Sequence, residues 1–145
     1  MGEDSSVFTT LRWQEGHVAW LPEHLIRLQD HAERLGIAWP EDFIQQLHST
    51  PLQGEGNLCR IQLGWGGDIS VTLRHSHYGP SPLTAASQEA PRFPEQIQGT
   101  KHGEWDGYHD ARKQSIDKGA DIGLLRTKSA GNGYELNARD MFCPT

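Results

Sequence analysis

The sequence has little of what membrane-bound, secreted and disulfide-stabilised proteins need. Among 145 residues there are two cysteines, Cys59 and Cys143, in no disulfide or metal-binding spacing, so we expect free thiols. No apolar run is long enough to span a membrane, and the first residues lack the basic start and apolar segment of a secretory signal. The sequence therefore predicts a cytoplasmic protein with no membrane partner.

Basic charge is also scarce. The chain has 13 Lys and Arg against 19 Asp and Glu, which gives a net charge of -6. Such a chain has no general field that attracts nucleic acid or anionic lipid. We therefore expect no nucleic-acid partner, and any anion that binds must be held by a local cluster of basic groups.

Periodicity and turn residues divide the first half of the chain into alternating elements. β-branched and aromatic residues indicate strands, and apolar residues at steps of three and four indicate helices, the first of which begins at Pro22 and ends at Gly36. A glycine-rich turn between two alternating segments predicts a β-hairpin. The predicted elements are strands over 7–13 and 17–21, helices over 22–35 and 40–47, and a hairpin of 57–63 with 69–74.

The second half begins after a change in composition. Prolines among small and polar residues predict a linker, with one short strand at its end. Beyond it we expect a helix whose inner side carries Tyr108, Ala111, Ser115 and Ile116, capped by Gly119, and then further strands. We predict an α/β (α+β) fold with an N-terminal domain over 1–78, a linker over 79–100 and the beginning of a second domain over 101–145.

A lysine and an acid in the second half have the spacing of a cofactor site. Lys101 follows the proline-rich segment, and Glu135 lies 34 residues later, after a predicted helix, strand and turn. A lysine amine can condense with the aldehyde of pyridoxal phosphate, and an acid beside the ring nitrogen keeps that nitrogen protonated. The alternative interpretation is that both are solvated surface groups, as most Lys and Glu are.

Four ordered blocks carry a resemblance to a known family. They are Pro-Glu-His-Leu-Ile-Arg-Leu at 22–28, Gly-Thr-Lys-His-Gly at 99–103, the strand at 119–125, and Tyr134-Glu135 leading to Met141-Phe142. In order and spacing they resemble the class IV pyridoxal-phosphate enzymes, which include branched-chain aminotransferases, D-amino-acid aminotransferases and aminodeoxychorismate lyases. The opening at 7–12 and the Lys101-His102 pair are most similar to the lyase branch.

This resemblance implies a set of roles. Lys101 matches the lysine that binds the cofactor aldehyde and then moves the substrate proton. Arg27 matches the helix arginine that grips the cofactor phosphate, and Glu135 matches the acid paired with the pyridine nitrogen. The family further implies pyridoxal 5'-phosphate as the cofactor, no metal, a small amino-acid-like substrate and a homodimer with the active site near the interface.

The lyase branch implies elimination of pyruvate from aminodeoxychorismate to leave 4-aminobenzoate for folate biosynthesis. A branched-chain or D-amino-acid aminotransferase is the alternative. Departures from the family pattern include Glu104, Trp105 and Asp106 after the lysine, and Asp140 in place of an asparagine. The resemblance covers about the front half of a family member, so an inactive truncated fragment, or a half that requires a partner, is the second hypothesis.

Other constellations stay open as weaker alternatives. His75 and His77 alternate along one strand and, with His102 or His109, would offer imidazoles to zinc. The glycines at 64–67 would form a phosphate cradle only if a lysine, a serine and a helix followed, so we interpret them as turn residues. No serine lies in a nucleophile elbow, and the five tryptophans are scattered singly, which favours packing over base stacking.

Overall fold

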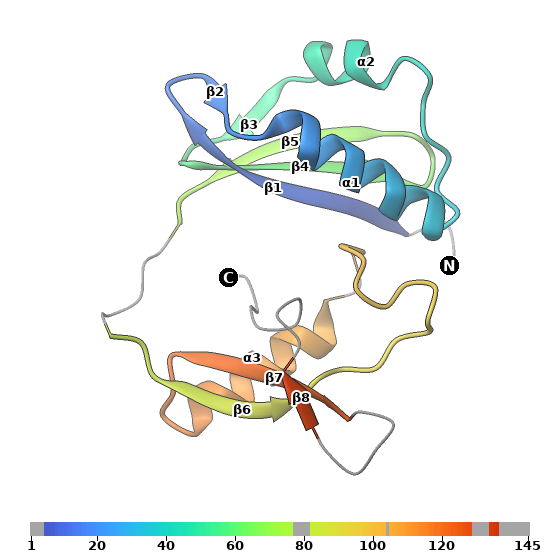
Figure 1. The fold of residues 1–145 in the computed structure, drawn as a ribbon. Helices are drawn as coiled ribbons and strands as arrows, with labels where there is room; N and C mark the ends of the chain where they lie inside the picture. The colour runs from blue at the N-terminus through green and yellow to red at the C-terminus, as the bar shows by residue number, and fades with distance from the viewer. Residues whose placement is uncertain (1–4, 77–81, 104, 129–133, 137–145) are drawn as a thin grey trace. The chain divides into compact units, whose positions relative to one another are not determined.

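The computed structural model describes residues 5–76, 82–103, 105–128 and 134–136, without the side chains of the last two residues of the 105–128 range or of 134–136. The chain divides into two compact units (Figure 1). The first consists of Met1–Ser76 with Glu95–Gly103, and the second of His77–Pro94 with Glu104–Thr145. Lys101 therefore groups with the first unit, whereas the sequence suggested a boundary just before it.

The first unit is built on a five-stranded sheet in the order β2-β1-β4-β5-β3. All neighbouring strands are antiparallel except β3, which runs parallel to β5. The strands are β1 (Ser6–Gln14), β2 (His17–Val18), β3 (Leu52–Gly54), β4 (Leu58–Gly64) and β5 (Ile69–Arg74). The predicted first strand and hairpin are thus confirmed, and β3 was not predicted.

Strand alternation separates an apolar face of this sheet from a polar one. Val7, Thr9 and Leu11 of β1 pair with Leu63, Ile61 and Cys59 of β4, and all six are buried. Directly paired residues project to the same face, so these side chains form the core layer. The intervening residues lie on the opposite face, where Thr10, Arg60 and Gln62 are half-buried and Phe8 is buried.

Helix α1 (Leu21–Arg34) lies across the apolar face of the sheet, as Figure 1 shows, and α2 (Phe43–Ser49) follows it in the chain. Leu28, His31 and Ala32 are the buried residues of α1, and Gly36 follows its end with a φ of 70°. The positive φ favours glycine because it has no Cβ. The leucine-based prediction of this helix is therefore confirmed.

Two predicted boundaries are wrong. The second strand ends at Val18 rather than at residue 21, because Trp20 adopts a left-handed conformation, with a φ of 59°, that ends the extended backbone before Leu21 begins the helix. The second helix begins at Phe43 rather than at Pro40, because the residues after Pro40 form a turn in which the Phe43 N–H donates to the Pro40 carbonyl at 3.1 Å.

Truncation of Phe43 tests the packing of α2. The Phe43 side chain is 1% exposed and its ring stacks on Trp39 with centroids 4.0 Å apart. We expect Phe43→Ala to lower the free energy of unfolding by about 3–5 kcal/mol, because burial is lost and a cavity remains. Urea titration measures this change. Ile44→Ala is the control, since Ile44 is 50% exposed on the same helix, and equal losses for the two variants would contradict the assignment of α2's buried face.

The second unit combines a three-stranded sheet with one helix. Strands β6 (Ala85–Glu89), β7 (Ile122–Lys128) and β8 (Tyr134–Leu136) lie in that order, with β6 parallel and β8 antiparallel to β7. Helix α3 (Asp106–Asp117) connects the parallel pair, as parallel strands require a crossover. The strand predicted at the end of the linker instead lies within it, as β6.

Helix α3 buries Ala111 and Ser115 and packs Tyr108 against the small core, as predicted. Ile116 was expected inside but is 46% exposed. Consecutive residues of a helix are rotated by about 100° around its axis, so Ile116 points away from the core that the fully buried Ser115 faces. Three helices and two sheets in the described residues confirm the α/β (α+β) class.

Parts of the predicted second half fall outside the described residues, namely the turn before Tyr134, the strands expected after residue 136, and Cys143. Cys59 is a buried free thiol, and burial raises its pKa. Within the described ranges, no helix combines the length and the apolar character needed to cross a bilayer.

Candidate active site

Lys101 lies at the edge of β1. The Phe8 N–H donates to the Lys101 carbonyl and the Gly103 N–H donates to the Ser6 carbonyl, both at 3.0 Å, while His102 pairs with Val7. Residues 101–103 therefore run antiparallel to the start of β1, which they join through an isolated bridge. Because side chains alternate across it, the Lys101 side chain lies on the face of Phe8, and His102 points to the core, where it is fully buried.

Helix α1 holds this segment from its other side. The Lys101 N–H donates to His31 Nδ1 at 3.1 Å, and Arg34 donates to the carbonyl of Gln98 at 2.8 Å. In the sequence His31 follows Arg27 off the leucine stripe of the helix, together with Arg34, which favours a polar, solvent-facing or ligand-facing side. The structure corrects this, because His31 lies three residues after buried Leu28 and so shares its inward face.

The Lys101 amine lies in an unusual electrostatic environment. Its Nζ is 5.4 Å from the centroid of the Phe8 ring. Burial, followed by the nearby guanidinium groups of Arg27 and Arg60, lowers the pKa of Lys101 from 10.5 to about 8. In the described part of the chain no carboxylate lies within ion-pair distance of Lys101. A far larger fraction of this amine than of an ordinary lysine is therefore neutral and nucleophilic near neutral pH.

Arg27 is oriented by two neighbours. One terminal nitrogen of Arg27 donates to Thr9 Oγ1 and to His24 Nδ1, each at 3.0 Å, and Thr9 Oγ1 lies 2.7 Å from the same His24 nitrogen. That nitrogen accepts from Arg27, so it carries no proton. Burial and then Arg27 lower the pKa of His24 in agreement with this arrangement. Arg27 is otherwise exposed, and in the described residues no acid pairs with it, so its guanidinium is available to an anion.

Arg60 is a site residue that sequence reasoning missed. Its guanidinium carbon lies 3.8 Å from the centroid of the Phe8 ring, and a terminal nitrogen donates to Gln62 at 2.9 Å. Its Nε is buried and has no hydrogen-bond partner among the described residues. A charged residue in the alternating apolar stretch at 58–63 was the available signal. Thr9 was also missed, and its available signal was a polar residue in the inward phase of β1.

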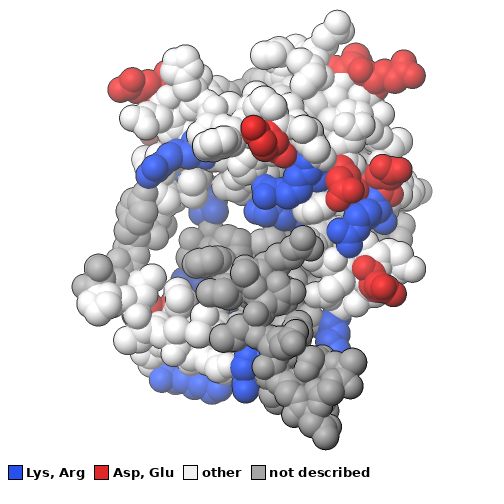
Figure 2. All heavy atoms as spheres, viewed as in Figure 1, with Lys and Arg blue, Asp and Glu red and all other residues white. Residues whose placement is uncertain are grey.

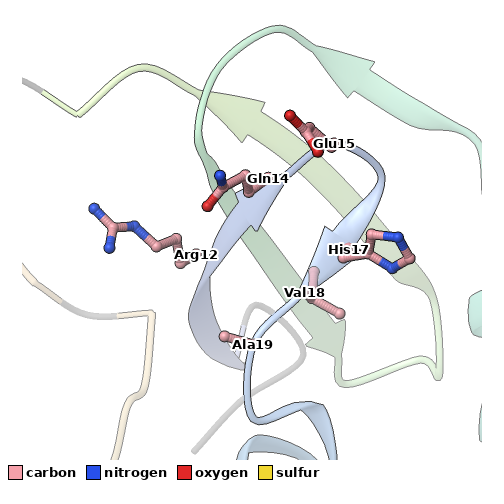
Figure 3. Close-up of a pocket in the computed structure, with 6 residues that line it drawn as sticks. All are labelled: Arg12, Gln14, Glu15, His17, Val18 and Ala19. Atoms are coloured by element: carbon pink, nitrogen blue, oxygen red, sulfur yellow. The ribbon is translucent and has the colours of Figure 1, made fainter.

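A separate hollow lies at the hairpin of β1 and β2. Its volume is about 290 Å³, and Figure 3 shows Arg12 and Gln14 extending from β1 beside it, with His17 and Val18 on β2. It contains neither Lys101 nor Arg27 and places no nucleophile beside a base, so it does not compete with Lys101 as a site of chemistry.

Neither the charge on the visible surface nor the metal-ligating side chains of the described residues indicate a second functional site. Figure 2 shows basic and acidic side chains interspersed on the visible face of the molecule. Among the described residues, no three His, Cys, Asp or Glu side chains are grouped closely enough to hold a metal ion. The zinc alternative is therefore unsupported there, and His77 itself lies outside the described residues.

The structure brings together two of the three predicted site residues. Lys101 and Arg27 both belong to the first unit and interact electrostatically. Glu135 belongs to the second unit, where its backbone pairs with Thr127. The Glu135 side chain lies outside the described part of the chain, so its pairing with a cofactor ring stays a prediction.

The donor set of the first unit fits pyridoxal 5'-phosphate. A partly buried amine that loses its proton readily suits the aldehyde, and a guanidinium fork with free donors suits the phosphate dianion. Both requirements are met by Lys101 and Arg27 without rearrangement of an existing ion pair.

Comparison with known proteins matches this chain to a family model and to solved structures. The family model described as amino-transferase class IV matches residues 6–135. A solved structure of a candidate 4-amino-4-deoxychorismate lyase is 30% identical, with a TM-score of 0.60, and the match covers 83% of this chain and 52% of that one. No curated protein sequence matches this chain.

Two more distant structures share the fold. A candidate amino-acid aminotransferase from Mesorhizobium loti is 22% identical, with a TM-score of 0.60, over 86% of this chain and 63% of that one. A fold IV transaminase from Curtobacterium pusillum is 17% identical, with a TM-score of 0.65, over 87% of this chain and 50% of that one. This chain thus spans about half to two thirds of the length of the structures it resembles.

Proposed function

Since the chain belongs to the class IV aminotransferase family, we propose that it binds pyridoxal 5'-phosphate at Lys101 and acts as a lyase resembling 4-amino-4-deoxychorismate lyase. The reaction eliminates pyruvate from the substrate and leaves 4-aminobenzoate. The observation that carries the proposal is the state of the Lys101 amine. Its pKa is lowered to about 8 by burial and by the nearby Arg27 and Arg60.

Each site residue has a defined task in this proposal. When bound, the cofactor supplies an aldehyde that captures amines and a ring that accepts electrons. Lys101 Nζ provides the attachment point and then, once free, takes the proton from the substrate α-carbon and returns a proton to the product. Arg27, held by Thr9 and His24, donates to the phosphate. Glu135 is proposed to keep the pyridine nitrogen protonated.

Arg60 is the residue best placed to receive a second anionic group. It lies on the Phe8 face of the sheet with Lys101, and its buried Nε has no partner within the described residues. A buried unpaired donor is costly unless a ligand satisfies it. A substrate carboxylate is the matching acceptor, which is consistent with an amino-acid-like substrate.

The lyase assignment is supported by the 30% identity to a candidate 4-amino-4-deoxychorismate lyase. The second candidate is a class IV aminotransferase, which the description of the family and the Mesorhizobium loti structure favour. Both use the same lysine, so they differ in substrate and not in cofactor chemistry. A homodimer in the cytoplasm, with the lyase product entering folate biosynthesis, completes the proposal.

A pyridoxal phosphate titration tests the function. We expect a new visible absorbance band with saturable binding, and borohydride reduction followed by peptide mass mapping should place the adduct on Lys101. The loaded protein is then assayed for 4-aminobenzoate release from aminodeoxychorismate and for amino transfer from branched-chain and D-amino acids. Amino transfer without 4-aminobenzoate release favours the second candidate.

The opposing hypothesis is an inactive half that requires a partner. It predicts that no adduct forms, or that adducts scatter over exposed lysines such as Lys113 and Lys118. Light scattering adds an independent measurement. A chain that aggregates and regains cofactor binding only with a second polypeptide would support the fragment hypothesis and overturn the proposal for this chain alone.

A further inference from the structure

His31 contacts the backbone of Lys101 rather than solvent. The His31 side chain is 7% exposed and lies on the buried face of α1 with Leu28 and Ala32. Its Nδ1 accepts the Lys101 N–H at 3.1 Å, across 70 residues of sequence. No role for this histidine follows from the motif that identified Arg27 and Lys101.

The hydrogen bond requires a neutral ring. An imidazole nitrogen accepts a hydrogen bond only when it carries no proton. The pKa of His31 is lowered from 6.5 to about 4. Burial is the main cause, Arg27, Arg34 and Lys101 act in the same direction, and Asp30 opposes them. At neutral pH His31 is therefore an acceptor, and its Nδ1 is available to the Lys101 amide.

The two backbone polar groups of Lys101 are held from opposite sides. Its carbonyl accepts the Phe8 N–H of β1 at 3.0 Å, and its N–H donates to His31 of α1. Together these bonds define the position of the Lys101 Cα between a strand and a helix. The direction of the side chain, and hence its place near the Phe8 ring, follows from that position.

We propose that His31 is a positioning residue, which holds the Lys101 backbone so that Nζ stays near the Phe8 ring and within electrostatic range of Arg27 and Arg60. Without the acceptor on α1, the Lys101 N–H would turn to water and the segment would shift away from the helix. The amine would then gain hydration and move away from the two guanidinium groups. The inference rests on the proposed role of Lys101 as the reactive amine, but its test needs no cofactor.

Three substitutions separate positioning from simple packing. His31→Leu removes the acceptor and keeps an apolar side chain in the buried site. His31→Asn keeps an acceptor at the position of Nδ1, because its side-chain oxygen is the same number of bonds from the backbone. His48→Leu is the matched control, since His48 is exposed on α2. Thermal melts establish which variants are folded.

The measurement is the rate of acetylation of Lys101 by acetic anhydride as a function of pH, read by peptide mass mapping on the full chain. Only the neutral amine reacts, so the midpoint of the profile reports the pKa of Lys101. In the unsubstituted chain and in His48→Leu we expect a midpoint near the value of about 8 that burial, Arg27 and Arg60 produce.

In His31→Leu the midpoint should move toward 10.5, the ordinary lysine value. At pH 8 the rate should then fall by roughly tenfold or more, because far less of the amine is neutral. His31→Asn should keep a midpoint close to that of the unsubstituted chain. This rescue distinguishes a lost hydrogen bond from a disturbed core.

Two outcomes overturn the inference. A folded His31→Leu variant whose midpoint stays near 8 shows that the lysine does not need His31. If His31→Leu fails to fold, His31→Gln replaces it, since its longer side chain cannot place an acceptor at the Nδ1 position, and equal midpoints for the Asn and Gln variants overturn the inference. A normal midpoint near 8 without any pyridoxal phosphate adduct would overturn the proposed function and leave the role of His31 intact.

Discussion

Replacing Lys101 with alanine is expected to abolish the borohydride-stable attachment of pyridoxal 5'-phosphate to the chain. Lys101 combines burial with the nearby positive charge of Arg27 and Arg60, which brings its pKa to about 8. An ordinary surface lysine is almost wholly protonated at pH 7.5 and reacts slowly in comparison. Absorbance after titration, with peptide mass mapping after reduction, measures the loss, which should exceed about a hundredfold in adduct yield.

The lowered pKa of Lys101 also predicts how adduct formation changes with pH. The neutral amine is the nucleophile, so adduct formation in the unsubstituted chain should increase as pH rises and level off above about 8, where the proton of Lys101 has been lost. Lys113→Ala is the control, because Lys113 is exposed on α3 and should contribute nothing to the profile. An unchanged adduct yield in Lys101→Ala would show that another lysine carries the cofactor.

Arg27→Ala is expected to weaken pyridoxal phosphate binding by about a hundredfold, close to 3 kcal/mol. The guanidinium loses its donors to the phosphate dianion, and neither Thr9 nor His24 supplies a positive charge in its place. Arg27→Lys should recover part of the loss, because it restores the charge without the planar fork. Equilibrium titration with pyridoxal phosphate and with pyridoxal, which lacks the phosphate, measures the difference.

The two ligands make the assignment of Arg27 testable. Arg27→Ala should weaken binding of pyridoxal phosphate far more than binding of pyridoxal, since only the former carries the dianion. Arg92→Ala is the control for lost positive charge, because Arg92 forms an exposed ion pair with Glu89 at 3.3 Å. If both ligands lose affinity equally in Arg27→Ala, then Arg27 supports the fold of the site and does not grip the phosphate.

Periodic elements of the first unit were predictable because their patterns are local. Leucine at helical spacing defined α1, and alternating residues around a glycine turn defined the hairpin of β4 and β5. The start of α2 was predicted three residues early, because Pro40 suits both a first helical turn and the turn that it forms. Strand β6 was placed wrongly, because a parallel strand depends on pairing with the distant β7.

The candidate site was predictable only where a residue type matched a motif. Lys101 and Arg27 were identified in this way, and the structure places them in one unit. Arg60 and Thr9 were missed because a single polar residue in an alternating strand is only a weak local signal. Their contacts, with the Phe8 ring and with α1, are made only in the folded chain. His31 was assigned to the polar side of α1 although its spacing from Leu28 agreed with the buried side, since a histidine is compatible with either environment.

The sequence by itself determined the family, the α/β class and the helix that carries Arg27, and it singled out Lys101 as the candidate lysine, because these depend on residue types and short-range spacing. Only the tertiary structure decided that residues 95–103 group with the first unit, that His31 holds the Lys101 backbone, and that Arg27 and Arg60 lie close enough to lower the Lys101 pKa. These contacts join residues that lie 41 to 74 positions apart in the sequence. Burial and charge proximity act through space, so the reactivity of Lys101 is a property of the folded chain and not of the motif that contains it.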